Sequence, residues 1–239
     1  MKKLLLLAFI TLLLSSFQFS KRIEKVSMAS TIKTLKDGKV ITLKSYTYYQ
    51  SLGGQMTVHF TYPLEELVFT NIRGEYKQYN PASNSVYVAE GVEYSTRTNY
   101  LHQFLSYKTR DMGLSEMNYK QASNKLEDGM LVSEWRNNNL EGMVLKVKLV
   151  HEKNLPIFIA NYENDELVSK TFYSKYESFE GITLPMRITE ITYLPEGDSL
   201  ITKRDFSDVK FNEFVNDTYL KYQIPNTAKL LENPGPNAK

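Results

Sequence analysis

Apolar and polar side chains alternate along much of the chain between residues 40 and 210. Leu145, Val147 and Leu149 are separated by lysines, and Met56 and Val58 begin a similar run. A repeat of two residues is typical of a β-strand that buries one face. Turn-forming pairs such as Asp-Gly, Gly-Gly and Asn-Pro fall between these runs, roughly every 8 to 14 residues. The sequence therefore predicts a fold that is mainly β.

Helical periodicity is confined to three short segments. Residues 27–36 are expected to form a helix before the first strand. Residues 99–107 place apolar side chains on one side at helical spacing. Residues 115–122 are expected to form a third helix, because Ser115 is a suitable N-cap. Strands are thus expected first, then a helical insertion near residues 94–127, then strands again.

The N-terminus has the pattern of a secretory signal peptide. Two lysines precede an apolar run over residues 4–14, and this run is shorter than the roughly 18 residues that a membrane-spanning helix needs. We expect residues 1–20 to be removed on export, with an end at residue 29 as the alternative. A single domain is expected over residues 21–232, followed by a frayed tail over residues 233–239.

The composition narrows the class of protein further. The chain has no cysteine, so it has no disulfide framework, although export would permit one. Its 29 basic and 27 acidic residues give a net charge of +2, which argues against non-specific nucleic-acid binding. The 17 tyrosines suit partly wet sheet faces, because the ring is apolar and its tip is polar. Together with the signal pattern, these features predict a soluble protein of the bacterial periplasm.

Motifs of known enzyme classes are absent from the sequence. It contains no Gly-x-Ser-x-Gly elbow, no phosphate-binding glycine loop and no His-Glu-x-x-His pair. The three histidines lie far apart, and His59 and His151 fall on polar strand faces, where we expect them to be solvated. Glu65, Glu66 and the acids of residues 163–166 flank turns and are expected to be solvated as well. We therefore expect a non-enzyme with no catalytic residues, no metal site and no cofactor.

Two apolar features leave alternatives open. Trp135, the only tryptophan, is expected in the core, although it could also form the wall of a pocket. The apolar side of residues 99–107 is either buried core or a lid over a cavity, because this helix interrupts a series of strands.

Three stretches in their order resemble the periplasmic outer-membrane lipoprotein carriers, the LolA-like proteins. The first is "MTVHFTYPLEELVFTNIRGEYKQYNP", in which a strand ends in Pro63 and a second apolar strand follows a turn. The second is "LPMRITEI", and the third is "FSDVKFNEFVNDTYLKYQIP". The resemblance extends over nearly the whole mature chain. It implies an unclosed, strongly bent antiparallel sheet, a half-barrel, with a few short helices covering its concave face.

The resemblance also implies a function. An apolar cavity would take the acyl chains of lipoproteins, or a related amphiphile, and move them toward the outer membrane. The residues expected to bind them are Met56, Val58, Phe60, Leu67, Phe69, Leu145, Val147 and Leu149, with Leu101, Phe104 and Leu105 as a lid. An inner-membrane donor and an outer-membrane acceptor protein would be partners of a monomeric carrier. The alternatives are a half-barrel that senses lipid or lipoprotein through a protein partner, and an exported hydrolase.

One position departs from the family. Well-studied carriers have an arginine directly before the proline that corresponds to Pro63, and it ties the lid to the sheet. This chain has Tyr62 there, which lacks the fixed charge and the forked donors of a guanidinium. The lid-latching role of the arginine is therefore not carried over.

Overall fold

The computed structural model describes residues 22–140, 143–179, 181–195 and 197–231. The predicted signal peptide, residues 1–20, and the predicted tail, residues 233–239, lie outside these ranges. Within them, no helix has the length and apolar character needed to cross a membrane.

The described residues form mainly strands, as predicted. The strands are β1 (Lys25–Lys36), β2 (Lys39–Gln50), β3 (Gln55–Tyr62), β4 (Glu66–Thr70), β5 (Glu75–Asn80), β6 (Ser85–Glu90), β7 (Lys120–Glu127), β8 (Met130–Leu140), β9 (Met143–Glu152), β10 (Leu155–Glu163), β11 (Glu166–Phe179), β12 (Ile182–Tyr193), β13 (Ser199–Phe211) and β14 (Lys229–Leu231). The helices are η1 (Leu52–Gly54), η2 (Val92–Tyr94), η3 (Thr96–Thr98), α2 (Tyr100–Leu105), η4 (Leu114–Met117) and η5 (Asn212–Phe214).

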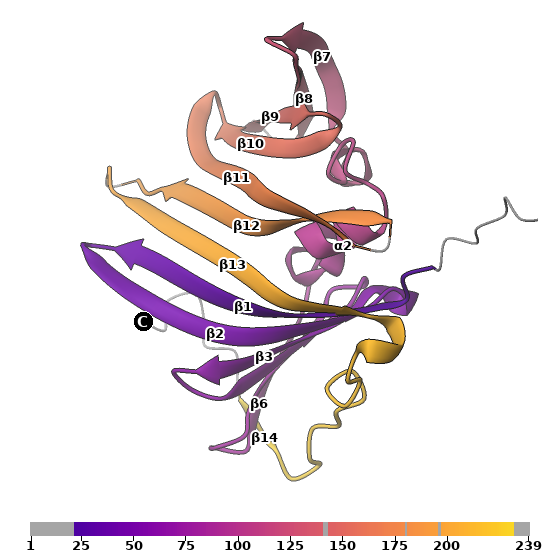
Figure 1. The fold of residues 1–239 in the computed structure, drawn as a ribbon. Helices are drawn as coiled ribbons and strands as arrows, with labels where there is room; N and C mark the ends of the chain where they lie inside the picture. The colour runs from indigo at the N-terminus through magenta and orange to yellow at the C-terminus, as the bar shows by residue number, and fades with distance from the viewer. Residues whose placement is uncertain (1–21, 141–142, 180, 196, 232–239) are drawn as a thin grey trace, which may run out of the picture.

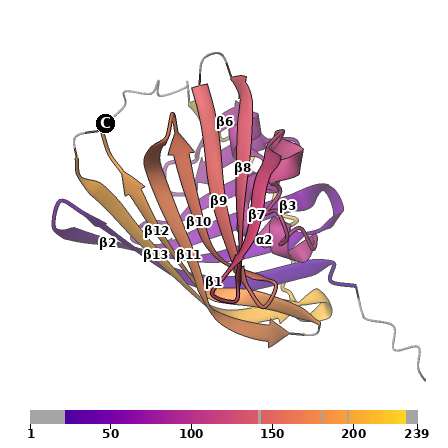
Figure 2. The same cartoon turned by 90° about the horizontal axis from the view of Figure 1, so that it is seen from above.

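All of these strands belong to one unclosed sheet of the described residues. Its order is β14-β6-β5-β4-β3-β2-β1-β13-β12-β11-β10-β9-β8-β7, and every pair is antiparallel except β14 with β6. Strands β1 to β6 form one meander and β7 to β13 form another, and β1 joins them by pairing with β13. The sheet is bent into an open arc, and α2 lies on its concave side (Figures 1 and 2). The predicted half-barrel is thus confirmed.

The connection between the two meanders explains why helices cover the concave face. Strand β6 lies next to one edge of the sheet and β7 forms the other edge, so residues 91–119, here called the insertion, must cross from one side to the other. The insertion contains η2, η3, α2 and η4. A path across the hollow of a bent sheet is short, and apolar side chains on that path become buried against the inner face.

The helix predicted over residues 99–107 is confirmed as α2, but the other two helix predictions are wrong. Residues 27–36 belong to β1, because Val26 and Met28 alternate with polar residues and both neighbouring strands pair with this segment. Of residues 115–122, only the start lies in a helix, η4. From Lys120 the chain forms the edge strand β7, whose residues are all exposed. Lysines on an edge strand oppose pairing with other chains.

The main core lies between the inner face of the sheet and the insertion. Its buried members include Val26, Met28, Tyr49, Met56, Leu101, Phe104, Met112, Leu114, Trp135, Val147, Leu149, Tyr173, Leu184 and Ile188. Trp135 is therefore a core residue, as expected, and its indole N–H donates to the Ser133 hydroxyl at 3.0 Å.

The outer face of the first meander is covered as well. Residues 212–231, here called the C-terminal segment, run along it and end in β14 beside β6 (Figure 1). Tyr219 stacks on Tyr48 with ring centroids 5.0 Å apart, and Tyr222 stacks on Phe69 at 5.9 Å. Both faces of this half of the sheet are therefore partly buried, one by the insertion and one by the C-terminal segment.

Candidate binding cavity

A cavity of about 430 Å³ remains on the concave side of the sheet, beside the insertion. We call it the inner cavity. It is lined by the inner-face side chains Ser30, Ile32, Ser45, Thr47, Met56, Val58, Phe60, Thr171, Tyr173, Ile188, Glu190, Arg204 and Phe206, and by Thr98, Asn99, Tyr100 and Gln103 of the insertion. Its volume falls within the range of roughly 300 to 1,000 Å³ that is usual for small-molecule sites.

Strand alternation puts three of the predicted binding residues on the cavity wall. Met56, Val58 and Phe60 occupy every second position of β3, and all three line the inner cavity. Strand β2 supplies Thr47 and Ser45 opposite Val58 and Phe60. The wall is thus apolar on β3 and hydroxyl-bearing on β2.

Leu67 and Phe69 lie on the other face of the sheet, contrary to expectation. In the β3–β4 register, Leu67 is opposite His59 and Phe69 is opposite Thr57, so their side chains face outward. Phe69 packs against Tyr222 of the C-terminal segment. The turn between β3 and β4 places the apolar positions Leu67 and Phe69 on the outer face, whereas those of β3 lie on the inner face. Alternation within one strand does not show which face its apolar positions occupy.

The predicted positions on β9 belong to the core and not to the cavity wall. Val147 and Leu149 are buried in the same cluster as Leu101 and Met112, beneath the insertion. Leu145 is half-buried near the start of β9. That any of these residues contacts a ligand stays a prediction.

The lid residues of α2 are firmly packed. Leu101 and Phe104 are buried, and Leu105 packs against the same cluster. The Asn99 side chain caps the helix by accepting from the backbone N–H of Leu101 at 2.9 Å. Tyr100, on the cavity side, contacts the ring of Phe206 at 5.2 Å between centroids. The insertion therefore forms a docked cover over part of the cavity.

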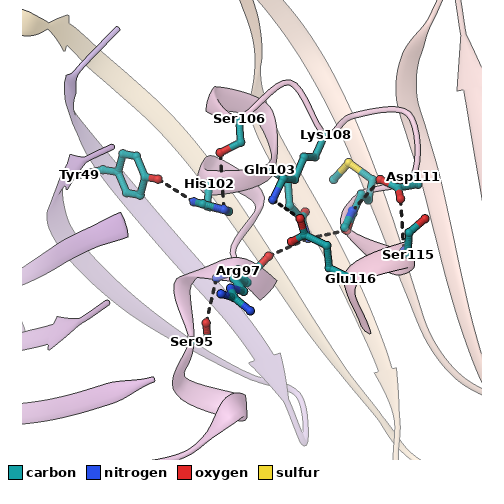
Figure 3. A network of polar contacts seen from close by, with 12 residues as sticks. Tyr49, Ser95, Arg97, His102, Gln103, Ser106, Lys108, Asp111, Ser115 and Glu116 are labelled. Atoms are coloured by element: carbon teal, nitrogen blue, oxygen red, sulfur yellow. Dashed lines mark hydrogen bonds and ion pairs between the residues drawn. The ribbon is translucent and has the colours of Figure 1, made fainter. Parts of the chain in front are cut away.

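Polar contacts fix the insertion to the sheet and to itself (Figure 3). The Tyr49 hydroxyl of β2 lies 2.7 Å from Nδ1 of His102 in α2. The Gln103 amide donates to the carbonyl of Met112 at 2.6 Å, and Lys108 contacts Glu116 at 2.5 Å. Tyr62, at the end of β3, is 52% exposed. A link between the lid and the sheet is instead made by Tyr49 and His102.

Burial favours the neutral forms of both partners in the Tyr49–His102 contact. Burial raises the pKa of Tyr49 to about 12, so its hydroxyl stays protonated and can donate to an imidazole nitrogen. Burial, together with the charge of Lys108, lowers the pKa of His102 below its usual 6.5. Protonation of His102 would remove the acceptor and place a charge in a buried site.

We therefore expect the protein to lose stability as the pH falls below about 6.5. The unfolded chain binds a proton at His102 before the folded chain does, so the free energy of unfolding decreases in this range. Urea unfolding between about pH 5 and 8 measures the effect. His102→Gln keeps an acceptor but does not titrate, so its profile should be flatter. Identical profiles for the two proteins would contradict this role of His102.

The other two histidines are buried, so the expectation that they are solvated is wrong. His59 Nε2 lies 3.0 Å from Glu65 Oε1, and its ring stacks on Tyr219 at 4.4 Å. His151 Nε2 donates to the carbonyl of Thr109 at 2.7 Å. Segments distant in sequence cover both strand faces, which alternation alone did not indicate. Among the described residues, no three His, Asp or Glu side chains gather in a way that could hold a metal ion.

Sequence reasoning also missed an ion pair inside the cavity. Arg204 of β13 and Glu190 of β12 both line the inner cavity, and their Nη1 and Oε2 atoms are 3.4 Å apart. The cavity is therefore of mixed character, with apolar walls and one pair of opposite charges. The sequence does carry a signal for it. Charged residues occur at both odd and even positions of β12 and of β13, so some of them must lie on the inner face.

A larger hollow of about 790 Å³ lies on the outer side, between β4, β5 and the C-terminal segment. Its lining includes Arg73, Glu75 and Lys77 beside Phe69 and Tyr222. Burial there is shallow, because the side chains of Arg73 and Glu75 are 72% and 45% exposed. The inner cavity is the better candidate for a site, because the bent sheet and the insertion enclose it from two sides.

Comparison with known proteins bears on the fold. The sequence matches no protein-family model and no curated protein. Among solved structures, a DUF1329 family protein from Desulfovibrio piger matches with a TM-score of 0.57 and 19% identity, covering 84% of this chain and 90% of that one. A LolA superfamily protein from Nitrosomonas europaea matches with a TM-score of 0.55 and 12% identity, over 82% and 90% of the two chains. An outer membrane lipoprotein-sorting protein domain from Vibrio parahaemolyticus, itself described as putative, has a TM-score of 0.57 and 13% identity, over 83% and 90%. The open, bent sheet of this chain, with its helical insertion on the concave side, is therefore a LolA-like fold.

Proposed function

We propose that this protein is a carrier in the periplasm that binds the hydrocarbon part of a lipid or of a lipidated protein in its inner cavity. The observation that carries the proposal is space: the concave face holds a cavity of about 430 Å³ that the chain's own side chains leave open. Met56, Val58 and Phe60 give this space an apolar wall. The likeness to a lipoprotein-sorting domain and the signal-like N-terminus support the same role.

The physics of such a ligand fits a cavity of this kind. Burying an acyl chain is worth about 0.8 kcal/mol per CH₂, so a lipid in water gains from even a shallow apolar groove. A carrier must also release its ligand, which a closed core would prevent. Because Leu101 and Phe104 hold the insertion in place, we propose that the ligand enters and leaves over the part of the concave face that the insertion does not cover.

We expect Val58→Asp to weaken binding of a fluorescent fatty acid by more than about tenfold, because a carboxylate would have to be desolvated beside the tail. Val58 lines the cavity, whereas Val88 on β6 is exposed and does not. Val88→Asp is therefore the matched control and should bind like the unchanged protein. Fluorescence titration measures both affinities, and native mass spectrometry of the unchanged protein should show a co-purified lipid. Equal binding by the two variants would contradict the proposed site.

A further inference from the structure

The ion pair in the inner cavity is unusual for its surroundings. Arg204 and Glu190 belong to adjacent strands, and each side chain is 36% exposed on the concave face. They share the cavity wall with apolar Ile188 and Phe206. At this exposure both charges keep part of their hydration, so the pair contributes little to stability, and both groups are accessible to a ligand. This pair therefore needs an explanation beyond the stability of the sheet.

A second ion pair on the same two strands gives the comparison. Arg187 of β12 and Asp205 of β13 lie directly opposite each other, on the outer face of the sheet. Both Nε and Nη2 of Arg187 contact Oδ1 of Asp205 at 2.6 Å. The inner pair makes a single contact at 3.4 Å. A guanidinium can form several hydrogen bonds to an anion, so the inner pair uses only part of what Arg204 offers.

The charge of the wall limits the kind of headgroup that fits. Arg204 and Glu190 are the charged side chains among the residues that line the cavity, so its formal charge is zero. A purely anionic headgroup would face Glu190, and a purely cationic one would face Arg204, and each would leave one charge opposed. A headgroup that carries both charges can satisfy both side chains. The hydroxyl of Thr171 on the same wall can bind one of its remaining oxygens, whereas the hydroxyls of Ser30 and Ser45 are buried and bonded to each other at 2.7 Å.

We propose that the inner cavity selects a single-chain zwitterionic lipid, whose phosphate binds Arg204 and whose ammonium binds Glu190. This inference rests on the proposed function, because it assigns the headgroup to the same cavity that holds the tail. The cavity's 430 Å³ is near the lower end of the usual range for ligand sites, roughly 300 to 1,000 Å³, which favours one chain over several. The apolar tail would lie along Val58 and Phe60 of β3.

Three lipids with the same myristoyl chain test the proposal. Lysophosphatidylethanolamine is zwitterionic, lysophosphatidylglycerol is anionic, and monomyristin is uncharged. Each is titrated against the mature chain, below its micellar concentration, by displacement of a fluorescent fatty acid. We expect the zwitterionic lipid to bind about tenfold more tightly than either of the others, as two charge-assisted contacts would give.

Two variants and one control identify the residues. Arg204→Gln leaves Glu190 unopposed, so the anionic lipid should bind less tightly than monomyristin and the zwitterionic lipid should lose most of its advantage. Glu190→Gln should shift the preference to the anionic lipid, because the wall then carries a net positive charge. Arg187→Gln removes the outer pair of the same strands and should leave all three affinities unchanged. Thermal unfolding of each variant verifies that it is folded.

The outcomes separate the headgroup from the carrier role. Equal binding of the three lipids, unchanged in Arg204→Gln and Glu190→Gln, would overturn the headgroup inference and leave the carrier role in place. A preference for the zwitterionic lipid that Arg187→Gln removes as well would also overturn it. Failure of all three lipids to bind the folded, unchanged protein would overturn the proposed function.

Discussion

A chain that begins at Ser30 is expected to lose its cooperative unfolding transition, whereas a chain that begins at Lys21 is expected to keep it. The difference lies in the first half of β1, where Val26 is 0% exposed and Met28 is 2% exposed. Strand β1 is the one that joins the two meanders. Truncating a large buried side chain costs about 2 to 5 kcal/mol, and whole domains are stable by only about 5 to 15 kcal/mol.

Urea unfolding followed by the fluorescence of Trp135, the only tryptophan, measures this effect, because its side chain lies in the core. The shorter chain also loses the backbone pairs that residues 25–29 make with β2. A cooperative transition in the longer chain alone would favour a signal-peptide end at residue 20 over one at residue 29. If both chains unfold at the same urea concentration, β1 does not join the sheet in the way described.

Phe104→Ala is expected to lower the free energy of unfolding by about 3 to 5 kcal/mol. Phe104 is 2% exposed, and its ring packs against Tyr173 and Tyr176 of β11, each with centroids 6.2 Å away. Removing the ring leaves a cavity between α2 and the sheet that the surrounding side chains cannot fill. Urea denaturation with the Trp135 signal gives the value.

A matched control lies in the same insertion. Val92 is 84% exposed, so Val92→Ala should change the free energy of unfolding by no more than about 0.5 kcal/mol. If Phe104→Ala also stays within about 1 kcal/mol of the unchanged protein, the insertion is a loose flap and not a docked cover. The ligand would then enter and leave by movement of the insertion, and not over the part of the concave face that the insertion leaves uncovered.

The strands and the helix α2 could be predicted because their patterns are local. Alternation in residues such as Met56 and Val58 marks a strand whatever lies around it, and the apolar side of α2 has clear helical spacing. The helix predicted over residues 27–36 is wrong because serines, threonines and lysines among few apolar residues fit either period. Pairing with β2 and β13 decides the outcome there, and that pairing is not local.

The site could be predicted only in part, for a related reason. The cavity wall on β3 follows from alternation, but the orientation of Leu67 depends on the turn and register between β3 and β4. The C-terminal segment, distant in sequence, buries His59 and the outer face. The contact of Tyr49 with His102 and that of Glu190 with Arg204 likewise join separate elements. Tyr49 and His102 are 53 residues apart, and Glu190 and Arg204 lie on the two strands of one hairpin, so neither contact follows from the pattern within a single element.

The position of β1 at the junction of the two meanders also has a consequence for how the chain folds. Each meander grows by hairpins between neighbouring strands, so its contacts form early at little entropic cost. The seam between them pairs Val26 with Phe211 and Leu35 with Ile201, so it brings opposite ends of the chain together. We expect this seam to form last. Until it does, β1 and β13 are edge strands with unpaired backbone groups. A lipid that contacts both half-sheets would stabilise the pairing of these two strands.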